Sequence, residues 1–259
     1  MKGPLWFVIL FVLIACSACS TLSRRIHPPT IHSKTAESEV LRSELSHRNA
    51  SLRTFKGTGK VIIFQNGKSY SSKVAWLGSA PEKLRVELFG SPGQPKIGFS
   101  CDGKWLYYYD HNDKTEPVKR IPTSDSGLQR FISIKITSKD IVSILSGRIP
   151  EYKYHSSEIL KAKSREGYVL VLHKKWWMGS QKIYLGANRQ KIESVEMYSG
   201  TSLVYRIEFN GVQSVKSYHI PKRIVVTNGE GNRFQLDIKR FWADAAVSSD
   251  LFVLKPPTP

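Results

Sequence analysis

The stretch KVIIFQNGKSYSSKVAW, residues 60–76, decides the fold class of this chain. Val61 and Ile63 alternate with Lys60 and Ile62 before Asn66-Gly67, and Tyr70, Val74 and Trp76 alternate with Ser71, Lys73 and Ala75 after it. An Asn-Gly pair between two alternating runs is a strong signal for a two-residue β-hairpin. The stretch therefore predicts two antiparallel strands that share one apolar face.

The same period-two pattern continues along the chain. Leu84, Val86 and Leu88 alternate with charged residues, and turns at Gly90–Gly93 and Asp102-Gly103 lead into strands expected at 96–101 and 105–110. Seven further strands are expected at about 153–162, 168–173, 181–186, 191–198, 201–210, 221–228 and 233–242.

Three segments have helical rather than strand character. We expect helices at 35–53, 125–135 and 138–146, the last capped by Thr137 or Ser138 and ended by Gly147. About eleven short strands with a few helices predict a mainly β (α+β) fold. We expect a strongly curved antiparallel sheet that forms an incomplete half-barrel, capped by the helices over a hydrophobic cavity.

The composition excludes several classes of protein. The 259 residues include 41% hydrophobic ones, which is too many for a disordered chain and enough for a sizeable core. Three cysteines exclude a disulfide-rich scaffold. The net charge of +18 is unusual and favours polyanionic partners such as nucleic acid, anionic lipid or lipopolysaccharide.

The N-terminus indicates export. A short basic start precedes the apolar run Leu5–Ala15, which is too short to span a bilayer and fits a signal peptide over residues 1–15. The sequence Leu13-Ile14-Ala15-Cys16 resembles the lipobox of bacterial lipoproteins. The resemblance implies acylation of Cys16, with Cys19 as a second candidate, and an ordinary cleaved signal peptide remains the alternative.

Export changes how the charge is interpreted. Residues 16–34 form a lipidated N-terminus and tether, and 35–259 a single domain. Removal of residues 1–15 takes away one lysine and leaves a net charge of +17, which favours anionic envelope lipid over nucleic acid. Ser17, rather than Asp, follows Cys16, and the resemblance to enterobacterial lipoproteins then implies an anchor in the outer membrane.

Catalytic and metal-binding patterns do not emerge from the sequence. Gly57-Thr58-Gly59-Lys60 lacks the spacing of a phosphate-binding loop and continues into a strand rather than a helix. HExxH, CxxC and G-x-S-x-G motifs do not occur. We therefore expect a protein that is not an enzyme and that uses neither a cofactor nor a metal.

The order of several short segments resembles the LolA/LolB-like lipoprotein-carrier superfamily, and in particular the outer-membrane LolB-like lipoproteins. After the lipobox, tether and first helix, these segments are Phe55–Val61, Ala75-Trp76, Lys83–Gly90, Asp102–Trp105, Asp140–Gly147, Pro221–Ile224 and Phe252–Pro257.

The resemblance implies an incomplete eleven-stranded barrel with a hydrophobic cavity under helices. It implies a monomer on the periplasmic face of the outer membrane that binds acyl chains of lipoproteins or lipids. Lipoproteins would reach it from a periplasmic LolA-like carrier, and nucleic acid is not a partner. The alternatives are a carrier of phospholipid or another hydrophobic molecule, or a non-carrying envelope protein that binds lipopolysaccharide or an acidic partner.

Two sets of site residues follow. The cavity-lining candidates are Val61, Ile63, Val74, Trp76, Leu84, Val86, Leu88, Trp105, Tyr107, Leu203, Tyr205, Ile207 and Leu236. In LolB-like proteins a loop after the third strand carries an exposed Leu, and Pro92 lies at that position here, with Phe89 as a substitute. The Lys174-Lys175-Trp176-Trp177 run suits a membrane interface as well as a hairpin end with one Trp in the core.

Overall fold

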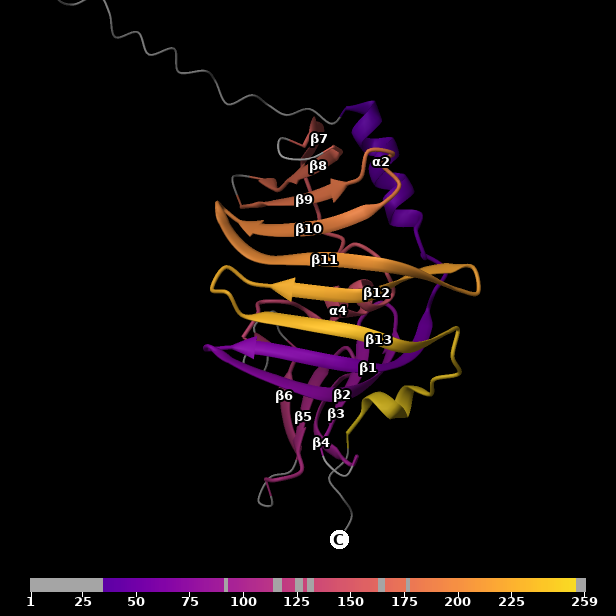
Figure 1. Ribbon diagram of the computed structural model, residues 1–259, viewed down its shortest axis with the longest axis vertical. Helices are drawn as coiled ribbons and strands as arrows, with labels where there is room; N and C mark the ends of the chain where they lie inside the picture. Colours follow the sequence, from indigo (N-terminus) through magenta and orange to yellow (C-terminus); the bar gives the residue numbers. More distant parts are fainter. Residues whose placement is uncertain are drawn as a thin grey trace, which may run out of the picture. The chain divides into compact units, whose positions relative to one another are not determined.

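Thirteen antiparallel strands form one sheet in the order β6-β5-β4-β3-β2-β1-β13-β12-β11-β10-β9-β8-β7 (Figure 1). The computed structural model describes residues 35–90, 93–113, 118–123, 128–129, 133–162, 166–175 and 178–254. The strands are β1 (Thr54–Gln65), β2 (Lys68–Ser79), β3 (Lys83–Phe89), β4 (Pro95–Cys101), β5 (Trp105–Asp110), β6 (Val118–Pro122), β7 (Ser156–Lys161), β8 (Tyr168–His173), β9 (Ser180–Leu185), β10 (Ile192–Ser199), β11 (Ser202–Val215), β12 (Tyr218–Thr227) and β13 (Arg233–Ala243).

Two meanders meet at the centre of this sheet. Strands β1–β6 form one and β7–β13 the other, and β1 pairs with both β2 and β13. The sheet is curved and not closed, since β6 and β7 form its two edges. The expected curved, open antiparallel architecture is therefore confirmed at this level. The strand number differs from the expected eleven, and β6 is a strand for which no alternation was identified.

Helix α2 (Ala36–His47) begins at Thr35, whose Oγ1 accepts a hydrogen bond from the backbone N–H of Ser38. Its buried face carries Leu41 and Leu45. The helix ends six residues before the expected limit, because Arg48 adopts extended backbone and Asn49 has a positive φ of 51°. Figure 1 shows α2 beside the β7–β10 end of the sheet.

Helix α4 (Ser138–Leu145) has the capping box expected of a Thr at its N-terminus. The Oγ1 of Thr137 accepts from the N–H of Asp140, and Oδ2 of Asp140 accepts from the N–H of Thr137. Gly147 follows the helix with a φ of +71°, a conformation that glycine adopts without steric cost. The expected boundaries of this helix are thus confirmed to within one residue.

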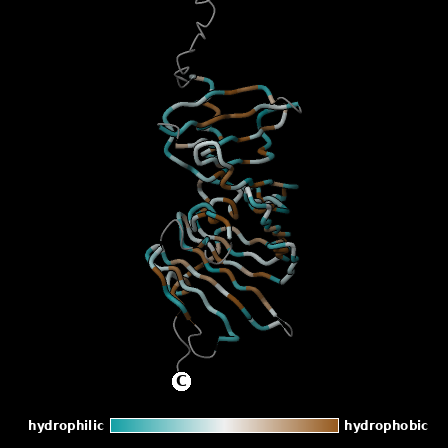
Figure 2. The backbone as a smooth tube through the Cα atoms, turned by 90° about the vertical axis from the view of Figure 1, so that its left-hand side faces the viewer, coloured by the Kyte–Doolittle hydropathy of each residue, from teal (hydrophilic) through white to brown (hydrophobic). Residues whose placement is uncertain are grey.

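The buried core lies mainly between the helices and the concave face of the sheet. Figure 2 shows hydrophobic stretches within the strands, separated by hydrophilic turns. A 3-10 turn, η2 (Ser249–Phe252), covers part of the opposite face at β3 and β4. There Ser100 Oγ donates to the carbonyl of Phe252 at 2.7 Å, and Arg85 Nη1 donates to that of Leu251 at 3.0 Å.

Several expectations fall outside the described residues. These are the signal peptide 1–15, Cys16 and Cys19, the tether 16–34, Pro92, Trp176 and Trp177, and most of the helix expected at 125–135. Ile134 and Ile136, at and just after the end of that expected helix, are buried in non-helical backbone. Within the described ranges, no helix combines the length and apolar character needed to cross a membrane.

Candidate hydrophobic ligand site

A cavity of about 180 Å³ lies between helix α4 and the concave face of the sheet. The lining side chains come from β1–β4, β12, β13, α4 and the segment before α4, and all of them are apolar. They are Val61, Ile63, Val74, Trp76, Val86, Leu88, Phe99, Ile134, Ile136, Ile141, Ile144, Leu145, Ile224, Val226, Phe234 and Leu236.

Trp76 forms part of the cavity wall and depends on a glycine in the neighbouring strand. Gly57 lies directly opposite Trp76 in the β1–β2 register, and the indole ring rests on its backbone. A methyl group on Gly57 would lie 2.2 Å from Trp76 Cζ2, so only glycine allows the ring this position. The ring of Phe55 covers Gly78 in the same way, two residue pairs further along the same two strands.

The chemistry of the cavity is that of a hydrocarbon site. An enclosed apolar cavity of about 150 Å³ is enough for benzene, so this cavity has room for small apolar groups. Ligand pockets for complete small molecules are usually about 300–1,000 Å³. The cavity thus has room for part of an alkyl chain, and a longer chain must extend through an opening or displace α4.

The cavity is buried at one end and more accessible at the other. Trp76, Ile144 and Leu145 are buried, whereas Ile63, Val226 and Phe234 are half-buried. Phe234 pairs with Ile63 on β1 and with Val226 on β12, so these side chains lie side by side. They lie near the β1–β2 and β12–β13 turns, which with the β3–β4 connection form the edge that we call the mouth rim.

The N-terminal end of α4 is attached to the other half of the sheet. The hydroxyl of Tyr152 donates to Asp140 Oδ2 at 2.5 Å and lies 3.1 Å from the hydroxyl of Tyr205 on β11. Burial raises the pKa of Tyr205 well above its usual range, so this hydroxyl stays protonated. The helix that covers the cavity is thereby joined to β11 through three polar side chains.

The C-terminal end of α4 is held by a residue that follows α2. Asn49 Nδ2 donates to the carbonyls of Ser146 and His219, each at 2.9 Å, and Asn49 Oδ1 accepts from the N–H of His219. These bonds satisfy a carbonyl that the helix end leaves without an intrahelical partner. Both ends of α4 are thus fixed by specific polar contacts.

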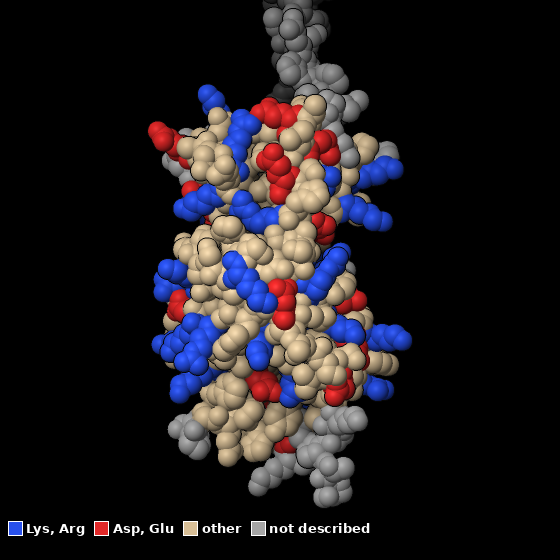
Figure 3. All heavy atoms as spheres, turned by 90° about the vertical axis from the view of Figure 1, so that its right-hand side faces the viewer, with Lys and Arg blue, Asp and Glu red and all other residues tan. Residues whose placement is uncertain are grey.

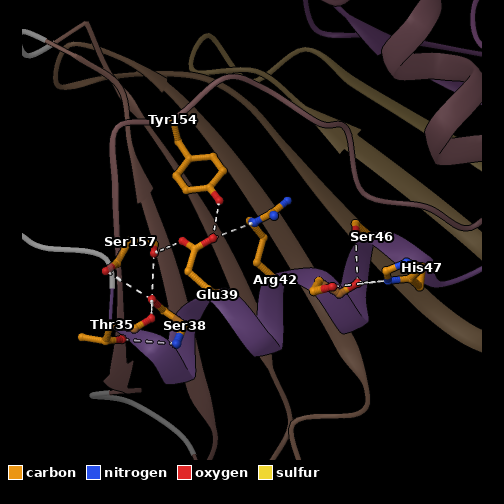
Figure 4. Close-up of polar contacts among 9 residues, drawn as sticks. Thr35, Ser38, Glu39, Arg42, Ser46, His47, Tyr154 and Ser157 are labelled. Atoms are coloured by element: carbon orange, nitrogen blue, oxygen red, sulfur yellow. Dashed lines mark hydrogen bonds and ion pairs between the residues drawn. The ribbon is translucent and has the colours of Figure 1, made fainter.

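Helix α2 is attached to the edge strand β7 by a second polar cluster, shown in Figure 4. Glu39 accepts hydrogen bonds from the hydroxyl of Tyr154 at 2.8 Å and from that of Ser157 at 2.9 Å. The hydroxyls of Ser157 and Ser38 lie 2.7 Å apart, and Arg42 Nε lies 3.4 Å from Glu39. This cluster covers one side of edge strand β7.

Seven of the thirteen residues named from strand alternation line the cavity. They are Val61, Ile63, Val74, Trp76, Val86, Leu88 and Leu236. The other six lie elsewhere in the structure. They are Leu84, Trp105, Tyr107, Leu203, Tyr205 and Ile207.

Tyr107 lies on the outer face of the sheet for a reason that the register makes clear. Leu106 pairs with Cys101 and faces inward with it, so Tyr107 faces outward opposite Ser100, under the η2 turn. Trp105 shares this outer face, where the guanidinium of Arg120 stacks 4.1 Å from the ring centroid. The alternation along β5 was right, but alternation does not say which face of a strand is concave.

The remaining residues belong to solid core or to the strand ends. Leu84 is on the concave face beyond the buried end of the cavity, paired with Gly78. Tyr205 and Ile207 are fully buried on β11, where Tyr152 and neighbouring strands fill the space, and Leu203 is half-buried near the β10–β11 turn.

The described membrane-contact candidates lie on different elements, Phe89 at the end of β3 and Lys174 and Lys175 just after β8. Phe89 is half-buried on the outer face opposite Lys73, and Lys174 Nζ lies 4.6 Å from the ring centroid of Tyr152. Lys175 is exposed.

Nine cavity residues were not identified from the sequence. Ile141, Ile144 and Leu145 belong to the predicted α4 helix, whose apolar face was recognised but not assigned to the cavity. The six others are Phe99, Ile134, Ile136, Ile224, Val226 and Phe234. The register Phe234–Ile63 follows from β1–β13 pairing between the two ends of the domain, which no local pattern predicts.

The outer surface is rich in basic side chains. Lys and Arg are spread over the face drawn in Figure 3, with fewer Asp and Glu between them. In the described part of the chain, no three His, Cys, Asp or Glu residues are grouped as a metal site requires.

Solved structures with the same architecture are known. A DUF1329 family protein from Desulfovibrio piger aligns with a TM-score of 0.62 and 13% identity over 85% of this chain and 98% of its own. A LolA superfamily protein from Nitrosomonas europaea has a TM-score of 0.58 and 13% identity over 84% of this chain and 97% of its own. The chain shares its fold with these two proteins.

A third solved structure carries the same fold. A putative outer membrane lipoprotein-sorting protein domain from Vibrio parahaemolyticus aligns with a TM-score of 0.58 and 17% identity, over 83% of this chain and 97% of its own. No protein-family model matches the chain, and no curated protein matches its sequence. At these identities the likeness concerns the fold alone.

Proposed function

We propose that this protein is an envelope lipoprotein that binds an acyl chain in the cavity under α4 and takes part in the localisation of lipoproteins to the outer membrane. The observation that carries the proposal is the cavity itself, whose sixteen lining side chains are all apolar. Each methylene group that moves from water into such a site contributes about 0.8 kcal/mol to binding.

The fold and the N-terminal sequence support the same function. Two of the structures with this fold are described as a LolA superfamily protein and as a lipoprotein-sorting domain. The Leu13–Cys16 sequence supports acylation and an outer-membrane anchor, with the domain on the periplasmic face. An acyl-chain carrier needs no catalytic group, so we propose that the protein is not an enzyme.

The apolar lining of the cavity also allows the bound acyl chain to be released. A ligand held only by apolar contacts is bound in proportion to the area buried, without a charged group that must be desolvated or neutralised. The half-buried Ile63, Val226 and Phe234 mark the end through which a chain enters and leaves. The identity of the acylated molecule, lipoprotein or phospholipid, is a further outcome of the test below.

Binding can be measured with a polyene fatty acid whose fluorescence rises in apolar surroundings. The purified full chain should bind this probe, and Val61→Phe, which fills the cavity beside Leu236, should weaken binding at least about fivefold. Ile62→Phe is the matched control, since it adds the same ring on the same strand but lies on the outer face. Equal binding by both variants, or no binding by the wild type, would contradict the proposal.

The cellular role requires a separate measurement. Depletion of the protein should leave several acylated lipoproteins outside the outer-membrane fraction, and the Val61→Phe variant should fail to restore them. If only phospholipid distribution changes, the cargo is phospholipid rather than lipoprotein. If binding to envelope material is instead abolished by high salt, the basic surface and not the cavity is responsible, because salt screens exposed charges but not acyl burial.

A further inference from the structure

The mouth rim carries exposed aromatic side chains on both sides of a hairpin turn. Phe64 is 41% exposed at the end of β1 and Tyr70 is 57% exposed at the start of β2, although both are large and apolar. Tyr70 pairs with Ile63, which lines the cavity, and therefore lies on the same concave face. The exposed surface of Tyr70 is thus continuous with the lining of the cavity, and Phe64 lies next to Ile63 on the outer face of the same hairpin.

Basic side chains lie on the same hairpin and on the adjacent strand β13. Arg233 lies directly opposite Phe64 on β13, Lys68 is in the hairpin, and Lys73 lies further along β2. All three are exposed, and none forms an ion pair within the described part of the chain. The turn between β12 and β13 adds one exposed acidic residue, Glu230. The three basic residues outnumber it, so this edge has an excess of positive charge.

We propose that this edge, the β1–β2 hairpin with Arg233, docks on the headgroup region of an anionic lipid bilayer. Aromatic rings favour the depth of the headgroups, where their apolar bodies leave water, and lysine or arginine beside them meets lipid phosphate. A charge excess next to exposed rings matches an anionic bilayer better than a protein partner, for which lysine is depleted at the contact.

The consequence for the cavity is direct. If the hairpin lies on the membrane, Ile63, Phe234 and Val226 face the bilayer, and an acyl chain passes between the cavity and lipid without crossing water. The docking surface deepens the proposed function. It rests on that function only for the passage of an acyl chain between the cavity and the lipid. The surface adjoins the loop at Phe89–Pro95, since Lys73 pairs with Phe89, and it differs from the Lys174–Trp177 run that the sequence indicated.

Amine footprinting on membrane-bound protein tests the docking surface. The full chain is reconstituted in vesicles of phosphatidylcholine alone and in vesicles that also contain phosphatidylglycerol, labelled with a water-soluble acylating reagent, and mapped by mass spectrometry. Lys68 and Lys73 should react about fivefold more slowly in the anionic vesicles. Lys216, which lies at the β11–β12 turn on the opposite rim, should react equally in both.

The opposite rim supplies matched control variants. Phe64→Ser with Tyr70→Ser should abolish the protection of Lys68, whereas Trp242→Ser with Val212→Ser should retain it. Trp242 and Val212 are 40% and 56% exposed, nearly the same as the two hairpin rings. Arg233→Glu should likewise reduce protection, and Arg240→Glu, further along β13, should not. Thermal unfolding of each variant shows whether it is folded.

Several results would overturn the proposal. They are equal labelling of Lys68 in the two kinds of vesicle, retained protection after both hairpin rings are removed, or loss of protection in the opposite-rim variants. The polyene fatty acid measurement separates this proposal from the proposed function. Probe binding without Lys68 protection rejects only the docking surface, and protection without probe binding rejects only the cavity function.

Discussion

Gly57 and Trp76 lie directly opposite each other on β1 and β2, and the indole ring covers the glycine so closely that a Cβ there would lie 2.2 Å from Trp76 Cζ2. The ring can form the cavity wall only because its partner has no side chain. The Nε1 atom of Trp76 is buried and has no hydrogen-bond partner among the described residues. Packing, and not a polar contact, therefore holds this ring in place.

Gly57→Ala should lower the free energy of unfolding by about 1–3 kcal/mol, because the ring must move to admit the methyl group. Weaker binding of the polyene fatty acid should accompany the loss of stability. Gly90→Ala is the control, since its Cβ would make only ordinary contacts with Lys96 at 3.5 Å. Urea unfolding of the two variants measures the difference, and equal stabilities would show that the wall is not set by this pair.

Loss of the Asp140 carboxylate should weaken the attachment of α4, the helix that covers the cavity. Asp140→Ala removes the hydrogen bond to the Thr137 N–H and leaves the Tyr152 hydroxyl without its acceptor, which should cost about 1–3 kcal/mol of stability. The dissociation rate of the polyene fatty acid, followed by stopped flow, should rise. Tyr152→Phe should raise it as well, while Tyr109→Phe, which removes an exposed hydroxyl bonded to His111, should leave it unchanged.

Glu196 should make stability depend on pH in the acid range. Burial raises its pKa, but hydrogen bonds from Tyr198, Arg206 and Tyr184 outweigh burial and hold the pKa below its ordinary value of 4.5. A lowered pKa in the folded state means that the stabilisation is fully present above pH 4.5 and is lost as pH falls through the folded-state pKa.

The Glu196→Gln variant tests this assignment. It should be less stable than the wild type by about 1–3 kcal/mol at neutral pH, and the difference should shrink below pH 4.5. Chemical unfolding at a series of pH values gives the two curves. Glu208→Gln, one residue pair along the same face of the sheet, is the matched control. A difference in the free energy of unfolding between wild type and Glu196→Gln that does not change with pH would contradict the role of the carboxylate.

Cys16→Ala should prevent acylation and leave an uncleaved or unanchored precursor. Mass spectrometry of the N-terminal peptide identifies the acylated residue directly. Cys19→Ala should be processed normally. Normal acylation of the Cys16→Ala protein would assign the modification to Cys19 instead.

The local sequence pattern was sufficient to predict much of the fold. Alternation on both sides of Asn66-Gly67 predicted β1 and β2, and Thr137, Asp140 and Gly147 predicted both ends of α4. Such signals succeed because they depend on neighbours within a few residues. The β6 strand escaped prediction because its residues, Val118–Pro122, do not alternate between apolar and polar types.

The site was only partly predictable. Val61, Ile63 and Trp76 were expected on the apolar face and do line the cavity, whereas Tyr107 and Ile207 were expected there and do not. Alternation divides a strand into two faces, but the curvature of the whole sheet decides which face is concave and whether space remains beside it.

The sequence by itself determined twelve of the thirteen strands, both ends of α4, the apolar faces and the positive charge, because each depends on residue type and short spacing. Only the tertiary structure decided that β1 pairs with β13, that α4 closes a cavity instead of a solid core, and that Phe64 and Tyr70 lie at its mouth. The physical reason is that pairing between strands about 180 residues apart and the volume left under a helix are properties of the whole packing, which no local pattern contains.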